Sequence, residues 1–217
     1  MVVKIMQWRS GNEQEKTRVS LARCVSSAIF KVLMLLAGLL VATAAHPQTS
    51  DAAWAALAQP RAVVLFRHAT APGVGDPAAF KLDDCTTQRN LSEDGRAEAR
   101  KIGEQFRARD IQVGAVLSSQ WCRTRETARL AFGEQAVRDE PAFNSQFGQR
   151  GQSGQGDAQT ARARAILAGW KGPGVLVVVT HQVNISALTE GFTASAEGVV
   201  LRAGEGGRLQ VLARVTP

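Results

Sequence analysis

The sequence contains no tyrosine, only three cysteines and three histidines, and no repeat of about 20 to 50 residues. The lack of a repeat argues against a solenoid, and the lack of a C-x-x-C motif leaves nothing that resembles a zinc site. Hydrophobic residues make up 45% and charged residues 21% of the 217 positions. This composition is globular, and the length fits one domain, with or without an extension.

The positive charge is concentrated near the amino terminus. The whole chain has a formal net charge of +7, whereas residues 1–45 alone contain six basic and two acidic residues. The rest of the chain therefore carries only +3. Its basic residues are not interleaved with aromatic ones, so neither charge nor composition indicates a nucleic-acid partner.

Residues 1–45 have the order of a secretory signal. A basic stretch ends at Lys31, an apolar run covers 32–41, and small residues follow, with cleavage expected after Ala44 or Ala45. The apolar run is short for a lone membrane-spanning helix, although an uncleaved anchor remains the alternative and would be the one membrane contact. Either way, the domain that follows is expected to be periplasmic or secreted.

The cysteines that follow the signal are two in number. Cys24 lies within the signal segment, which leaves Cys85 and Cys122. A pair of cysteines in an oxidising compartment favours a disulfide, and two buried thiols are the alternative.

Apolar runs that alternate with helical spacing indicate an α/β fold, a three-layer sandwich with a mainly parallel central sheet and helices on both faces. Strands are predicted over 62–66, 113–117, 175–179, 198–202 and 208–215, the last two as a hairpin, and helices over 92–109, 121–131 and 159–170. We expect a linker over 46–60, a mobile polar loop over 146–157, and one domain over 61–217.

Chemically active side chains follow the three most apolar strands. Arg67 and His68 follow the first, Arg123 comes shortly after the second, and His181 follows the third. Sites in α/β folds form at the carboxyl ends of strands. Guanidinium groups pair with phosphate oxygens, and nearby positive charge favours the neutral, nucleophilic form of histidine. The pattern therefore predicts a site for a phosphate dianion.

Four segments, in order, resemble the motifs of the histidine phosphatase superfamily, which has the phosphoglycerate mutase-like fold. They are L-F-R-H-A at 65–69, N-L-S-E-D-G-R-A-E-A at 90–99, S-S-Q-W-C-R-T-R-E-T-A at 118–128 and V-T-H-Q at 179–182. Together the motifs cover residues 62 to about 190, and their joint occurrence is far more specific than any one of them.

The resemblance implies a role for each site residue. His68 would be the nucleophile, Arg67 and Arg123 would hold the phosphoryl oxygens, and His181 would complete the pocket. Arg89 would be a further contact to phosphate or substrate. The resemblance implies neither a metal nor an organic cofactor.

The chain departs from the family pattern at informative positions. Ala69 replaces the usual glycine, as in members that resemble bacterial phosphohistidine phosphatases, and Gln182 stands where the acid-phosphatase branch has an acid. Glu140 and Asp76 are candidates for the proton donor, and the sequence does not decide between them. A good leaving group, such as a phosphoramidate, has less need of such a donor.

The sequence thus predicts an exported, metal-independent phosphatase that hydrolyses a phosphomonoester or phosphoramidate through a phosphohistidine on His68. Its partner would be a small phosphorylated substrate or a phosphopeptide. The alternatives are a phosphomutase, which export disfavours, and a catalytically silent module that binds phosphate or a sugar phosphate.

Overall fold

The computed structural model describes residues 48–147 and 155–217. The predicted signal segment and residues 148–154 of the predicted mobile loop lie outside these ranges. The last three residues of that loop, 155–157, belong to a helix.

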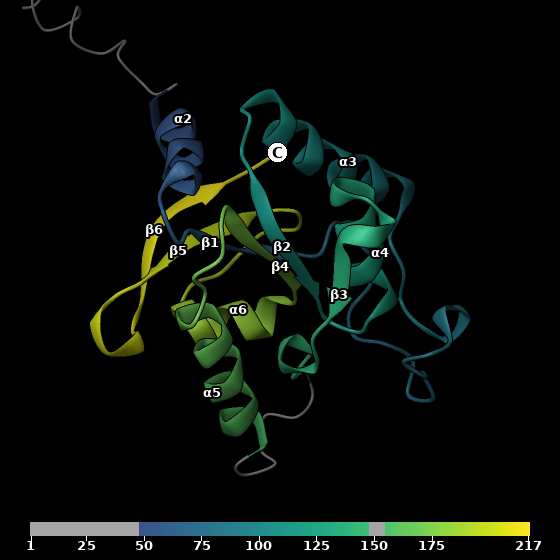
Figure 1. Cartoon of the computed structure of the whole chain (residues 1–217). Helices are drawn as coiled ribbons and strands as arrows, with labels where there is room; N and C mark the ends of the chain where they lie inside the picture. Colours follow the sequence, from purple (N-terminus) through teal and green to yellow (C-terminus); the bar gives the residue numbers. More distant parts are fainter. Residues whose placement is uncertain (1–47, 148–154) are drawn as a thin grey trace, which may run out of the picture. The chain divides into compact units, whose positions relative to one another are not determined.

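The described residues form a six-stranded sheet with the order β3-β2-β4-β1-β5-β6 (Figure 1). The strands are β1 (Val63–Arg67), β2 (Val113–Ser118), β3 (Val137–Asp139), β4 (Val175–Thr180), β5 (Gly198–Ala203) and β6 (Leu209–Val215). The first four pair in parallel, whereas β5 and β6 form the predicted antiparallel hairpin at one edge. The mainly parallel α/β sheet is therefore confirmed.

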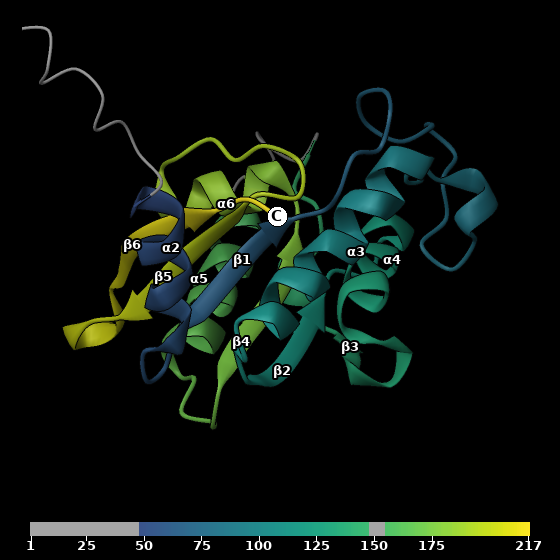
Figure 2. The same cartoon turned by 90° about the horizontal axis from the view of Figure 1, so that it is seen from above.

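Helices cover both faces of this sheet (Figure 2). They are α2 (Gln48–Ala55), α3 (Glu93–Ala108), α4 (Cys122–Phe132), α5 (Gln155–Ala168) and α6 (Gln182–Thr189). Side chains alternate along a strand, so Val64 and Phe66 of β1 pack in the core beneath α2, α3 and α4, whereas Val63 and Leu65 pack beneath α5 and α6. In the described ranges, no helix is both long and apolar enough to cross a membrane.

The start of α3 explains one of the family motifs. Ser92 caps the helix, because its hydroxyl oxygen accepts the backbone N–H of Gly95 at 3.0 Å. A Cβ atom at position 95 would overlap the carbonyl oxygen of Thr70, so a glycine lets the helix approach the loop that follows His68. The motif therefore fixes the distance between α3 and the chain around the first histidine.

One prediction about local structure is wrong, and one short strand was not predicted. Most of the expected linker over 46–60 is structured: residues 48–55 form α2, a 3₁₀ turn follows, and Trp54 and Leu57 are buried in the core. Trp54 packs edge-on against Phe106 with ring centroids 5.6 Å apart. The short strand β3 was not predicted, because only one of its three residues is apolar and its position comes from pairing with β2.

Candidate active site

The strand register brings the predicted residues together at the carboxyl ends of the central parallel strands. Arg67 pairs with Thr180 across β1 and β4, and the N–H of His68 donates to the carbonyl of Thr180 at 3.0 Å. The N–H of Ser119 donates to the carbonyl of Val179, also at 3.0 Å, so the end of β2 lies beside the same two strands. As a result, the rings of His68 and His181 are 5.5 Å apart between centroids.

The tautomer of His68 is fixed by its backbone. Its Nδ1 lies 2.8 Å from the carbonyl oxygen of Ala69, which can only accept, so Nδ1 carries the proton and Nε2 keeps its lone pair. His68 is 3% exposed. Burial is the largest cause that lowers the pKa of His68 to about 3; the charges of Arg123, Arg89 and Arg67 act in the same direction, and the hydrogen bond to Ala69 opposes them.

We therefore expect His68 of the free protein to stay neutral from pH 8 down to below pH 5. An NMR titration of the imidazole Cε1–H signals checks this, with His68→Ala for assignment. The folded state should also lose stability as the pH falls from 6.5 toward 3, because only the unfolded chain then takes up the proton at His68. A His68 signal that titrates near pH 6.5 would contradict both expectations.

His181 is held in the opposite tautomer, with the proton on Nε2. Its Nε2 lies 2.8 Å from the hydroxyl of Ser119, and its Nδ1 lies 3.5 Å from Nη2 of Arg123. A guanidinium only donates, so Nδ1 of neutral His181 accepts and Nε2 donates to Ser119. Burial holds the pKa of His181 well below its ordinary value, with Arg123 as a further cause. Trp121 packs against this ring, with ring centroids 5.3 Å apart.

The guanidinium groups of Arg67 and Arg123 lie near the histidines, and each has an N–H group without a hydrogen-bond acceptor among the described residues. Arg67 donates from Nη1 to the carbonyl of Thr193 at 3.0 Å, and Arg123 is 3% exposed. Within the described part of the chain, the Nε–H groups of both arginines are buried and lack an acceptor. Buried unpaired donors are costly, so both groups are placed to donate to an anion that enters the site.

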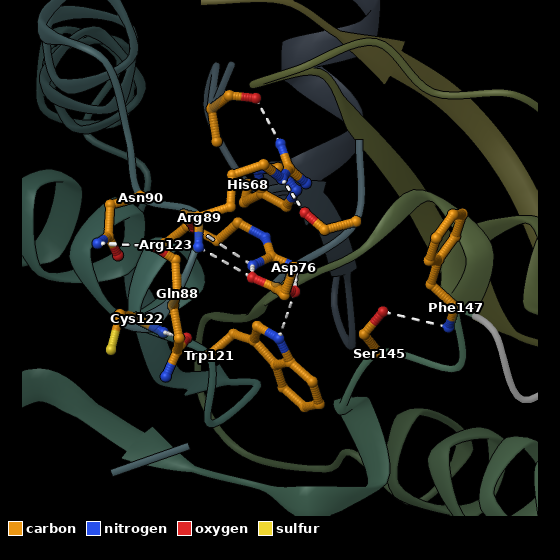
Figure 3. A network of polar contacts seen from close by, with 12 residues as sticks. His68, Asp76, Gln88, Arg89, Asn90, Trp121, Cys122, Arg123, Ser145 and Phe147 are labelled. Carbon is orange, nitrogen blue, oxygen red and sulfur yellow. Dashed lines mark hydrogen bonds and ion pairs between the residues drawn. The ribbon is translucent and has the colours of Figure 1, made fainter. Parts of the chain in front are cut away.

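Asp76 binds the same Arg123. Its carboxylate accepts from Nη1 at 2.8 Å and from Nη2 at 3.1 Å, and its side chain is 8% exposed. Burial alone raises the pKa of Asp76, but hydrogen bonds from Arg123 and from the backbone of Arg89 outweigh it, and the resulting pKa lies below the ordinary value. Figure 3 shows Asp76 between the guanidinium of Arg123 and the indole of Trp121. Asp76 is thus held as a carboxylate without a proton to donate near neutral pH.

The two remaining candidates make contacts of other kinds. The carboxylate of Glu140 accepts the backbone N–H of Ala142 at 3.0 Å and lies 3.3 Å from Arg162. Arg89 donates from Nε to the carbonyl of Gly75 at 2.9 Å and from Nη1 to that of Ala71, so it braces the loop after His68. It lies close to the site, because its backbone carbonyl accepts from Nη1 of Arg123 at 3.3 Å, and its charge lowers the pKa of His68.

Sequence reasoning missed the residues that support the site. The hydroxyl of Thr127 accepts the N–H of Ala69 at 3.1 Å and donates to the carbonyl of Arg123 at 2.7 Å, so it links both segments. Glu98 accepts from the N–H and hydroxyl of Thr70 at 2.9 and 3.0 Å. Both residues lie within the motifs quoted above, so their place in those motifs could have pointed to a supporting role. The indole N–H of Trp121 also donates to Asp76 at 3.0 Å.

The two cysteines fasten the loop to the site. Cys85 and Cys122 form the expected disulfide, with Cα atoms 5.7 Å apart and a separation of 37 positions in sequence. Cys122 is the first residue of α4, directly before Arg123. Gln88 adds a second link, since its side-chain oxygen accepts the N–H of Cys122 at 3.0 Å.

A known family model matches the part of the chain that contains the first three motifs. Residues 63–149 match the model described as histidine phosphatase superfamily (branch 1). The resemblance inferred from the four motifs is thereby confirmed. Among curated proteins, no sequence matches the chain.

Solved structures of other proteins share the fold. The protein histidine phosphatase SixA, in complex with tungstate, is 16% identical with a TM-score of 0.51, over 72% of this chain and 97% of its own. YhfR of Bacillus stearothermophilus is 14% identical with a TM-score of 0.54, over 70% and 95%. The mycobacterial glucosyl-3-phosphoglycerate phosphatase Rv2419c is 19% identical with a TM-score of 0.51, over 71% and 98%. At such identities the likeness concerns the fold.

Proposed function

We propose that the chain is an exported phosphatase that hydrolyses a phosphomonoester or phosphoramidate through a phosphohistidine on His68, without a metal. The observation that carries the proposal is the combination of an unprotonated Nε2 on buried His68 with two buried, unpaired guanidinium Nε–H groups beside it. A nucleophile next to donors that need an anionic acceptor suits phosphoryl transfer, which requires mainly positioning and charge stabilisation.

The proposed reaction has two steps. In the first, Nε2 of His68 bonds to phosphorus as the bond to the leaving oxygen or nitrogen breaks, and the leaving atom takes its electron pair and a proton from solvent. In the second, water attacks phosphorus and releases a proton to solvent, the P–N bond breaks, and the electron pair returns to Nε2. Arg67 and Arg123 bind the phosphoryl oxygens in both steps, which stabilises the charge of each transition state.

The surroundings of the carboxylates favour substrates with good leaving groups. Asp76 is ion-paired to Arg123, and Glu140 faces Ala142 and Arg162, so neither is poised to protonate a departing alkoxide. A phosphoramidate, such as a phosphohistidine peptide, has less need of a donor. The fold shared with SixA, named as a protein histidine phosphatase, supports the same substrate class.

A direct assay tests the proposal. Residues 46–217, incubated with EDTA, should release phosphate from p-nitrophenyl phosphate and, with a higher kcat/KM, from a phosphohistidine peptide. Binding of inorganic phosphate without any turnover would favour the silent module. Transfer of the phosphoryl group between sugar hydroxyls without net release would favour the mutase.

Export belongs to the same proposal. The order of basic, apolar and small residues over 1–45 supports it, and so does the disulfide, since such bonds persist in oxidising compartments. We infer a periplasmic or secreted location. The expected result is a processed chain, beginning near residue 45, in the extracytoplasmic fraction.

A further inference from the structure

Asp76 is a buried carboxylate with an unusually complete set of donors. Two come from Arg123, one is the indole N–H of Trp121 at 3.0 Å, and one is the backbone N–H of Arg89 at 3.0 Å. The loop that carries it follows His68 directly and is fastened to α4 by the disulfide. Nothing in the phosphoryl-transfer steps uses this carboxylate, so its role needs an explanation of its own.

The atoms of Arg123 that Asp76 occupies are informative. A guanidinium has an end edge, formed by Nη1 and Nη2, and a side edge, formed by Nε and Nη2. Asp76 binds the end edge in a bidentate manner. On the side edge, Nη2 lies 3.5 Å from Nδ1 of His181, and the buried Nε–H has no partner. The unoccupied edge is therefore the one that faces His181.

We propose that Asp76 is a positioning residue, which grips the end edge of Arg123 and so turns its side edge toward the phosphoryl group between the two histidines. The inference rests on the proposed function and assigns it a further residue. A long arginine side chain has several rotatable bonds, and a bidentate partner on one edge selects one orientation of the planar fork. Trp121 and the N–H of Arg89 hold the carboxylate itself in place.

Two other roles for Asp76 lead to different results. A proton donor would matter most for substrates with poor leaving groups. An internal competitor, with its carboxylate in the place of phosphate, would reduce the affinity for anions. A positioning residue affects the reactions of all substrates alike, because every phosphoryl transfer uses Arg123.

The first experiment compares Asp76→Asn with wild type on p-nitrophenyl phosphate and on phenyl phosphate, whose leaving group is poorer. We expect kcat/KM to fall about 100-fold for both, as is typical when a catalytic group is displaced by about 1 Å. The matched control is Asp139→Asn, which breaks another bidentate pair with α4, that of Asp139 with Arg125 (Nε to Oδ1, 2.8 Å). Arg125 lies two residues after Arg123, and this control should keep wild-type activity.

A double-mutant cycle separates positioning from a general loss of structure. In an Arg123→Lys background, Asp76→Asn should change kcat/KM less than about threefold, because an ammonium has no edge to orient. Full additivity of the two changes would overturn the proposal. So would a loss confined to phenyl phosphate, which indicates a proton donor, or a gain in activity or phosphate affinity, which indicates a competitor.

Two further measurements keep the test decisive. If Asp76→Asn does not fold, judged by its melting curve, Asp76→Glu keeps the charge and should lose activity equally on both substrates; an unequal loss counts against positioning. If wild type turns over neither substrate, the proposed function fails separately, and calorimetry with inorganic phosphate tests Asp76 alone. Weaker phosphate binding in Asp76→Asn would then support positioning, and unchanged or tighter binding would overturn it.

Discussion

Replacing His68 by alanine should abolish phosphatase turnover and leave the domain folded. The nucleophile has no substitute, and loss of such a group lowers kcat by a factor on the order of 10⁴ to 10⁶. The change removes a buried neutral ring, whose main polar contact is to the adjacent carbonyl of Ala69, so stability should fall by no more than about 2 kcal/mol. Initial rates with p-nitrophenyl phosphate and a melting curve measure the two effects.

The histidine pair supplies a matched control for this experiment. His181→Ala removes the other imidazole but keeps Nε2 of His68, so it should turn over slowly and still acquire an acid-labile, base-stable phosphoryl label. His68→Ala should acquire none. A labelled His68→Ala protein, or one with full turnover, would show that the nucleophile lies elsewhere.

Removing the disulfide by Cys85→Ala and Cys122→Ala together should cause the largest loss of stability. A bond that closes a loop of 37 residues constrains the unfolded chain by about 4 kcal/mol in the chain-entropy account. We expect unfolding to become about 2–4 kcal/mol easier and the Tm to fall by roughly 5–15 °C. Thermal melting in the presence and absence of reductant measures this.

The double alanine variant is also the control for the effect of reductant on wild type. Reductant should lower the Tm of wild type and leave that of the double alanine variant unchanged. Activity should fall with the bond, because Cys122 directly precedes Arg123 and the tethered loop carries Asp76. A wild-type Tm that does not respond to full reduction would contradict the expected stabilisation.

The parts of the fold that the sequence predicts are those whose own residues are stabilised by burial. Strands β1 and β4 are buried on both faces, so their apolar residues form unbroken runs. The helix α3 is buried on one face, and its apolar positions recur at helical spacing. In contrast, α2 and the 3₁₀ turn after it are held by the tertiary contacts of Trp54 and Leu57, and β3 by pairing with β2, so none of them leaves a local pattern.

The candidate site divides in the same way. His68, Ser119 and His181 follow strand ends, and the rule for parallel sheets is sufficient to bring them together. The ion pair between Asp76 and Arg123 joins residues 47 positions apart through the path of one loop. No spacing encodes that path, which is why the sequence offered Asp76 only as a possible acid.

The two unpaired Nε–H groups of Arg67 and Arg123 imply a trade-off between the stability of the fold and phosphatase activity. Each buried donor without an acceptor costs about 1–3 kcal/mol, so the unliganded protein is less stable than its fold would allow. A backbone or side-chain acceptor at that spot would recover the loss and at the same time occupy the place of the phosphoryl oxygens. Selection for turnover would therefore keep these two donors unpaired. Variants selected for thermal stability alone would tend to fill this place with an acceptor and lose phosphatase activity.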